Sequence, residues 1–144
     1  MSSALLLFLD FDGVLHPLGC EESLLFSHRV RFEALMREHP SVRIVISSAW
    51  QEAHALEALQ AMFSPDIAAR IIGVTGIAHP EGAPSSRYER IRAFLSHIGE
   101  AHVRWIAVDD AAHEFPPDCV ELLLCDSERG LDEQTLERLR KRLR

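Results

Sequence analysis

The stretch ALLLFLDFDG, residues 4–13, decides how the rest of the chain can fold. Its apolar run over 4–9 is typical of a β-strand that is covered on both faces of a sheet. Asp10 and Asp12 follow, and side chains two residues apart on a strand point to the same side, while Gly13 allows a sharp turn. Carboxylates this close repel each other unless a cation or a shared proton compensates. We therefore favour a magnesium site that holds a nucleophilic carboxylate and an acid/base, over a strand that simply ends in solvated turn residues.

Outward from this stretch, short apolar runs alternate with segments of helical periodicity. The expected strands are 4–9, 42–47, 70–74, 103–108 and 120–124, and the expected helices are 28–39, 50–63, a segment from Ser85 or Ser86 to about residue 98, and 132–143. Segments 13–27 and 75–86 contain Gly and Pro and predict loops. This alternation predicts an α/β fold: a Rossmann-like three-layer sandwich with a mostly parallel sheet, formed by residues 1–144 as a single domain without a separate cap domain.

Two further expected strands end in polar residues. Ser47 and Ser48 close the run over 42–47, and Asp109 and Asp110 follow the run over 103–108. A hydroxyl at a strand end can donate a hydrogen bond to an anionic oxygen, although it can equally cap the helix that follows. Because parallel strands bring their carboxyl ends to one edge of the sheet, we expect these side chains to meet Asp10 there.

The composition excludes several classes of protein. The 144 residues are 47% hydrophobic and 26% charged, which is globular rather than disordered or fibrous. A net charge of −7 argues against non-specific electrostatic binding to nucleic acid or to an anionic membrane. Cys20, Cys119 and Cys125 lack the spacing of a metal site or of a disulfide framework. The run over 4–9 is too short to cross a bilayer and does not resemble a signal peptide, so we expect a cytoplasmic protein with no membrane contact.

Three motifs together resemble those of the haloacid dehalogenase-like (HAD-like) superfamily of aspartate-nucleophile phosphohydrolases. They are LLLFLDFDGVL at 5–15, IVISS at 44–48 and WIAVDD at 105–110, in the family's order. The chain is most similar to small capless members, including those attached to nucleic-acid repair proteins, because Ser48-Ala49-Trp50 and Gly130-Leu131 resemble theirs. The resemblance implies a phosphatase that acts on phosphate monoesters, with a phosphorylated small molecule or a nucleic-acid end as its partner.

The resemblance also implies a role for each acid. Asp10 would attack phosphorus and become an aspartyl-phosphate, while Asp12 would protonate the leaving oxygen and then deprotonate the attacking water. Mg²⁺ would be held by Asp10, by the backbone carbonyl of Asp12 and by one acid of the pair Asp109 and Asp110. Alignment with the family's motif favours Asp110 as the ligand, which leaves Asp109 to orient a water or a cationic side chain.

Two positions depart from the family's pattern. The family places a lysine beside the transferred phosphoryl group, but the only lysine in this chain is Lys141. Arg87, which opens the helix before the strand over 103–108, is our candidate for this role, with Arg90 as the alternative, because a guanidinium also binds phosphoryl oxygens. The doubled serine leaves the phosphate donor open, because the spacing to the family's tryptophan favours Ser48, whereas counting along the strand favours Ser47.

The intervals between the motifs are too short for a cap domain, so the resemblance implies an open site and a bulky substrate. The loop over 13–27 would flank this site, with His16, Cys20 and His28 near its mouth. The Arg-rich end of the chain, RLRKRLR at 138–144, is expected to stabilise a helix C-terminus rather than to bind a phosphate backbone. A second function stays open at this point: a non-catalytic domain of the same fold that binds a phosphate or a partner, which the missing lysine favours.

Overall fold

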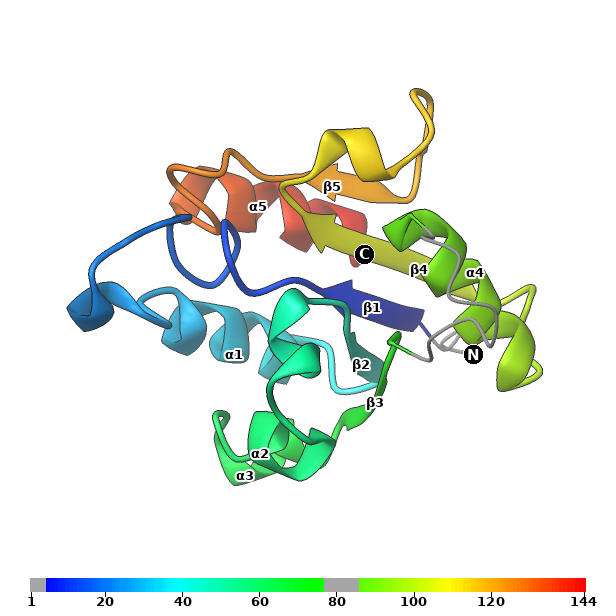
Figure 1. The fold of residues 1–144 in the computed structure, drawn as a ribbon, viewed down its shortest axis with the longest axis horizontal. Coiled ribbons are helices and arrows are strands. Elements are labelled where there is room, and N and C mark those ends of the chain that lie inside the picture. Colours follow the sequence, from blue (N-terminus) through cyan, green and yellow to red (C-terminus); the bar gives the residue numbers. More distant parts are fainter. Residues whose placement is uncertain (1–4, 77–85) are drawn as a thin grey trace.

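The computed structural model describes residues 5–76 and 86–144, which form a five-stranded sheet with every strand parallel, in the order β3-β2-β1-β4-β5 (Figure 1). The strands are β1 (Leu5–Leu9), β2 (Val42–Ile46), β3 (Ile71–Val74), β4 (Arg104–Asp109) and β5 (Leu122–Leu124). Each coincides with an expected strand to within two residues at either end. Ala4 and most of the loop expected over 75–86 lie outside the described residues. The predicted α/β fold is confirmed.

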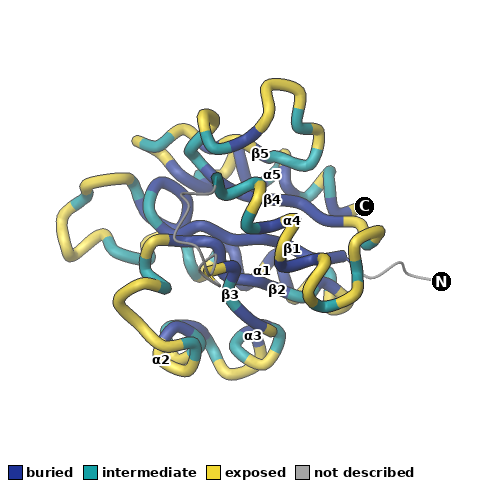
Figure 2. Tube along the Cα trace, turned by 45° about the vertical axis from the view of Figure 1, so that its right-hand side comes forward, coloured by how far each residue is buried: buried dark blue, intermediate teal, exposed yellow. Residues whose placement is uncertain are grey.

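Helices cover both faces of the sheet, which explains why β1 is buried along its whole length (Figure 2). Leu5, Leu7 and Leu9 point into the larger core, where α1 (Arg29–Glu38) and α5 (Glu133–Arg142) pack. Leu6 and Phe8 point to the opposite face, against α4 (Arg87–His97). The predicted three-layer sandwich is thus confirmed, and the described residues contain no separate cap domain.

The helix predicted over 50–63 is wrong in its extent. The segment instead forms a 3₁₀ turn at Ala49–Glu52, then α2 (Leu56–Gln60) and α3 (Pro65–Ala68). The indole of Trp50 donates a hydrogen bond to Asp12, which lies outside the segment. This contact holds the first turn in place, and the turn does not continue into one long helix. Pro65 begins α3, at a position where proline's missing N–H is not needed. Glu33 accepts hydrogen bonds from the backbone and hydroxyl of Ser64 and fixes this start.

The start of α4 is sharply defined by a capping box. The Ser86 side chain accepts a hydrogen bond from the Glu89 N–H, and the Glu89 carboxylate accepts one from the Ser86 N–H. Ser86 is therefore the cap of this helix, and Ser85, the other expected cap, lies outside the described residues. None of the described helices is long and apolar enough to span a membrane.

The Arg-rich end of α5 lies at the amino edge of the sheet. Arg104, the first residue of β4, donates a hydrogen bond to the carbonyl oxygen of Arg142. Arg140 pairs with Glu38 and with Glu137. These contacts hold the end of α5 against the sheet. They place its cations at the amino edge, away from the carboxyl ends of the strands.

The strand order reverses at β1, which lies between β2 and β4. The strands that follow β1 first extend the sheet on one side, and the last two extend it on the other. In open parallel sheets of this kind, ligands bind beyond the carboxyl ends of the strands at the reversal. The residues that follow β1, β2 and β4 are therefore the first to consider as a site.

Candidate active site at the carboxyl edge of the sheet

The strand register brings three buried polar residues into one row. Leu9, the last residue of β1, pairs with Ile46 of β2 and with Val108 of β4. The next residues, Asp10, Ser47 and Asp109, therefore lie side by side. All three are at most 3% exposed. Because side chains alternate along a strand, this row points to the face that α4 covers.

Three carboxylates meet at this edge. Asp10, Asp109 and Asp110 each offer an oxygen, and these oxygens lie within 4.8 Å of one another. Gly13 permits the approach, because its φ is +78° and a Cβ at this position would collide with the Asp110 carboxylate. Ser127 donates a hydrogen bond to Asp110 Oδ2 at 2.8 Å. Carboxylate oxygens are ligands that hard divalent cations prefer, so this donor set fits such an ion.

The acids strongly affect one another's ionisation. Burial, followed by the charge of Asp109, raises the pKa of Asp10 to about 8. Burial also raises the pKa of Asp109 above its ordinary value, against the opposing charge of Arg87. A carboxyl group with so high a pKa holds its proton at neutral pH unless a cation balances its charge. The cluster is therefore a place where a cation is needed.

Arg87 is the cation that the fold brings to these acids. Its Nη1 donates to Asp10 Oδ2 at 2.9 Å and to both oxygens of Asp109 at 2.8 Å. Burial alone would lower the pKa of Arg87, but the charges of Asp10 and Asp109 raise it overall, so the guanidinium stays charged. Its backbone is fixed as well, because the Arg87 N–H donates to the Glu114 carboxylate at 3.0 Å.

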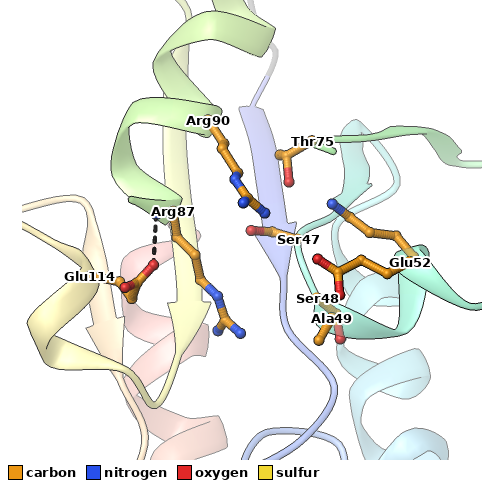
Figure 3. A pocket seen from close by; sticks show the side chains of 9 residues that line it. Ser47, Ser48, Ala49, Glu52, Thr75, Arg87, Arg90 and Glu114 are labelled. Atoms are coloured by element: carbon orange, nitrogen blue, oxygen red, sulfur yellow. Dashed lines mark hydrogen bonds between the residues drawn. The ribbon is translucent and has the colours of Figure 1, made fainter. Parts of the chain in front are cut away.

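The two serines of the doubled motif differ in their surroundings. Ser48 caps the 3₁₀ turn that follows it, since its side chain accepts a hydrogen bond from the Trp50 N–H at 3.3 Å. The hydroxyl of Ser47 makes no hydrogen bond with any residue between 5 and 76 or between 86 and 144, and it lines a pocket beside Arg87 (Figure 3). The geometry therefore leaves Ser47 available to a ligand and gives Ser48 a structural task.

Asp12 is held by neutral donors from elsewhere in the chain. Its Oδ1 accepts from His16 Nε2 at 2.7 Å and its Oδ2 from Trp50 Nε1 at 3.1 Å. The Phe26 N–H donates to His16 Nδ1 at 3.1 Å, which requires that Nε2 carry the imidazole proton. Both oxygens of Asp12 are thus fixed by N–H groups.

Sequence analysis missed the part that His16 and Trp50 play here. His16 is only 1% exposed and lies beneath the site rather than at its mouth, packed against the rings of Phe26 and Trp50. Its spacing of four residues from Asp12 was the one available signal. The loop conformation that makes use of this spacing depends on Phe26, which has a φ of 60°.

Two cavities lie on either side of Arg87. The larger, about 410 Å³, is lined by Asp10, Asp12, Leu18, Arg87, Asp110, Ala111, His113 and Ser127. The smaller, about 180 Å³, is lined by Ser47, Ser48, Ala49, Gln51, Glu52, Thr75, Arg87, Arg90 and Glu114, and Figure 3 shows both arginines reaching into it from α4. The loop over 13–27 contributes Leu18 to the larger cavity, and not the expected His16 or Cys20. His28 also stays out, with its Nε2 at the carbonyl oxygen of Arg129.

Comparison with known families gives one finding. The model of the family described as the HAD domain in Swiss Army Knife RNA repair proteins matches residues 6–136, which is nearly the whole chain. The resemblance drawn from the three motifs is confirmed by this match. No protein of curated function and no solved structure matches the chain.

The raised pKa of Asp10 predicts how the stability of the metal-free protein depends on pH. An unfolded chain ionises this carboxyl near pH 4, whereas the folded protein holds its proton up to about pH 8. The contribution of Asp10 is thus fully present below about pH 4 and is lost as the pH rises through about 8. Urea unfolding in EDTA at about pH 5 and about pH 9 should show a lower free energy of unfolding at the higher pH, and Mg²⁺ should restore much of it.

The matched variant for this measurement is Asp10→Asn, which keeps the side-chain shape but cannot ionise. It should lose less stability between the two pH values than the wild type, and it should respond less to Mg²⁺. An identical pH dependence in the two proteins would show that Asp10 is not the titrating group.

Proposed function

This chain belongs to the family of HAD domains found in Swiss Army Knife RNA repair proteins, and from its site we propose that it is a Mg²⁺-dependent phosphatase that forms an aspartyl-phosphate on Asp10. The observation that carries the proposal is the setting of the Asp10 carboxylate. Its Oδ1 accepts the Phe11 N–H at 2.8 Å, which leaves Oδ2 to face Arg87 at 2.9 Å. A fixed oxygen beside a cation, at the wall of an open cavity, is what attack on a phosphate requires.

We assign Mg²⁺ to Asp10, Asp110 and the backbone carbonyl of Asp12. Asp109 is the less suitable ligand, because Arg87 engages both of its oxygens and the Ala111 N–H donates to Oδ1 at 2.9 Å. When bound, the ion reduces the repulsion between the nucleophile and an anionic phosphate and stabilises charge that develops on the phosphoryl oxygens.

In the first step, Oδ2 of Asp10 attacks phosphorus, and a new O–P bond forms while the bond from phosphorus to the leaving oxygen breaks. Arg87 must release Oδ2 for this attack, but its two contacts with Asp109 keep the guanidinium in place. Arg87 and the Ser47 hydroxyl then donate to the phosphoryl oxygens, in the role of charge stabilisers.

Asp12 handles the protons in both steps. It gives a proton to the leaving oxygen as the first P–O bond breaks, and it takes a proton from the water that then attacks the aspartyl-phosphate. That second attack breaks the bond between phosphorus and Asp10 and returns the free carboxylate. The hydrogen bonds from His16 and Trp50 support this role, because they fix the direction of the Asp12 carboxylate at the wall of the larger cavity.

The family description and the open cavity support a terminal phosphate on a nucleic acid as the substrate. A binding domain without catalysis was the alternative, and the missing lysine was the feature that favoured it. The position of Arg87 beside Asp10 argues against this alternative, because a fixed positive charge is present without a lysine.

Phosphate release tests the activity itself. The wild-type protein should release phosphate from at least one ester in a panel of an aryl phosphate, nucleotides, phosphosugars, a phosphopeptide and oligonucleotides with 5′- or 3′-phosphates. Release should require Mg²⁺ and should vanish in Asp10→Asn, whereas Asp118→Asn, which alters an exposed acid, should keep it.

Two outcomes would contradict the proposal. Release that persists in Asp10→Asn would exclude this nucleophile. No release from any ester, together with Mg²⁺ binding measured by calorimetry, would favour the binding domain.

Substitution of Arg87 tests its role beside the phosphoryl group. Arg87→Ala should lower kcat/KM by about a hundredfold, since it removes a donor to the phosphoryl group and leaves Asp10 and Asp109 without their cation. Arg87→Lys should recover part of this loss, because the ammonium restores the charge but not the fork of N–H groups. Arg92→Ala, an exposed position on the same helix, serves as the control and should leave kcat/KM unchanged. An equal loss in both alanine variants would refute the role of Arg87.

Substitution of Trp50 tests how Asp12 is supported. Trp50→Phe keeps an aromatic ring against Phe11 and Phe26 but removes the Nε1 donor, so kcat should fall by about tenfold with little change in KM. Trp105→Phe removes an indole that is buried against Phe8 in the other core, and it should leave kcat unchanged. A rise in KM instead of a fall in kcat would mean that Trp50 serves substrate binding and not Asp12.

A further inference from the structure

The position of Asp12 indicates which cavity receives the leaving group. The group that protonates the leaving oxygen must lie beside it, and Asp12 lines the larger cavity but not the smaller one. Asp10 also lines the larger cavity, whereas the smaller pocket carries two carboxylates, from Glu52 and Glu114, beside its two arginines. The leaving group of the substrate therefore occupies the cavity of about 410 Å³.

Leu18 is presented to this cavity by a rigid turn. The Cys20 N–H donates to the Pro17 carbonyl oxygen at 3.2 Å, and Gly19 supplies the φ of +68° that such a turn needs. The Leu18 N–H donates to the Ser127 carbonyl oxygen at 2.8 Å, so its backbone is tied to the loop that also holds Asp110. Yet the Leu18 side chain is 58% exposed, which leaves an apolar surface at the mouth of a polar site.

His113 is presented from another element, the 3₁₀ turn Ala112–Glu114. Both ends of this turn are tied to the site, since the Ala111 N–H donates to Asp109 and the Glu114 carboxylate accepts the Arg87 N–H. The His113 side chain is 82% exposed, and within the described part of the chain its only polar contact is the Glu114 carboxylate at 3.7 Å. A ring held in this way is available to a ligand in the cavity.

The charges around the cavity restrict the leaving group. Its wall carries three carboxylates, from Asp10, Asp12 and Asp110, and one guanidinium. With Mg²⁺ held by Asp10 and Asp110, these charges would balance, so the cavity would offer an anionic leaving group no net attraction. The remainder of the wall is Leu18, Ala111, Ser127 and the imidazole ring of His113. Such a wall favours a neutral group with a planar, apolar face.

We propose that Leu18 and His113 bind the base of the nucleoside that carries the scissile phosphate, and that they thereby select nucleic-acid ends. The inference rests on the proposed function, because that function places the phosphate beside Asp10. Stacking of a base on an aromatic ring tolerates any base, so the selection is for a nucleotide end and not for a sequence.

Binding to the Asp10→Asn variant tests the inference without turnover. The ligands are a short single-stranded RNA with a 5′- or 3′-terminal phosphate and the same RNA whose terminal nucleotide is abasic, both measured by fluorescence anisotropy in Mg²⁺. The RNA with the intact terminal base should bind about tenfold more tightly at the end that the site accepts.

Added substitutions in the Asp10→Asn background identify the residues. Leu18→Ala and His113→Ala should each reduce the difference between the two RNAs, and the double substitution should remove it. His113→Phe should keep the difference, because stacking needs the ring and not the imidazole nitrogens. Val120→Ala, at a site that is 75% exposed, and His97→Ala, at the other end of α4, are the matched controls and should keep it.

The outcomes separate this inference from the proposed function. Equal binding of the intact and abasic RNAs by Asp10→Asn overturns the inference, even if the wild type releases phosphate. Tighter binding of a phosphotyrosine peptide than of either RNA, lost in the same variants, also overturns it and assigns the surface to a peptide. Discrimination for the base without phosphate release by the wild type supports the inference and contradicts the proposed function.

Discussion

Mutual repulsion among three carboxylates, two buried and one half-buried, is the constraint on which this site depends. The parallel register brings Asp10 level with Asp109, and the turn at Gly13 admits Asp110, so their oxygens lie within 4.8 Å. Such an arrangement is unfavourable unless protons or cations compensate it. Arg87 supplies one positive charge, and the pKa of Asp10 still remains near 8. One arginine therefore leaves the cluster short of positive charge, and this shortage, more than the sequence motif, is the physical reason to expect a divalent cation.

The carboxylates of Asp10 and Asp12 are only two residues apart and yet lie in different environments. Asp10 faces two other acids and a guanidinium, whereas Asp12 accepts hydrogen bonds from the neutral N–H groups of His16 and Trp50. Enzymes often separate the tasks of two nearby carboxyl groups through such a difference in surroundings. The division into a nucleophile and an acid/base is thus supported by the packing of the loop and not only by the order of residues in the chain.

Sequence reasoning succeeded where local pattern determines structure and failed where tertiary contacts override it. The strand at Leu5–Leu9 was evident from its apolar run, and Arg87 could be placed because a capping serine precedes it. One continuous helix was expected over 50–63, and its interruption was not predicted. The interruption depends on a hydrogen bond from Trp50 to a residue 38 positions away in the sequence. The capping role of Ser48 likewise could not be read from the sequence, because only side-chain contacts distinguish a cap from a free hydroxyl.

An open site raises the question of what excludes water during phosphoryl transfer. Electrostatic stabilisation by Arg87 is stronger when solvent is excluded, yet the described residues contain no domain that closes over the cavity. A bulky leaving group that rests on Leu18 and His113 would cover the mouth of the cavity by itself. In that case the size of the substrate determines both selection and catalysis. Only a substrate large enough to reach both residues shields the carboxylates and the guanidinium from water. A small phosphate ester would fit between the same acids but would leave them hydrated, so its turnover would be slow even though no contact to its phosphate is lost.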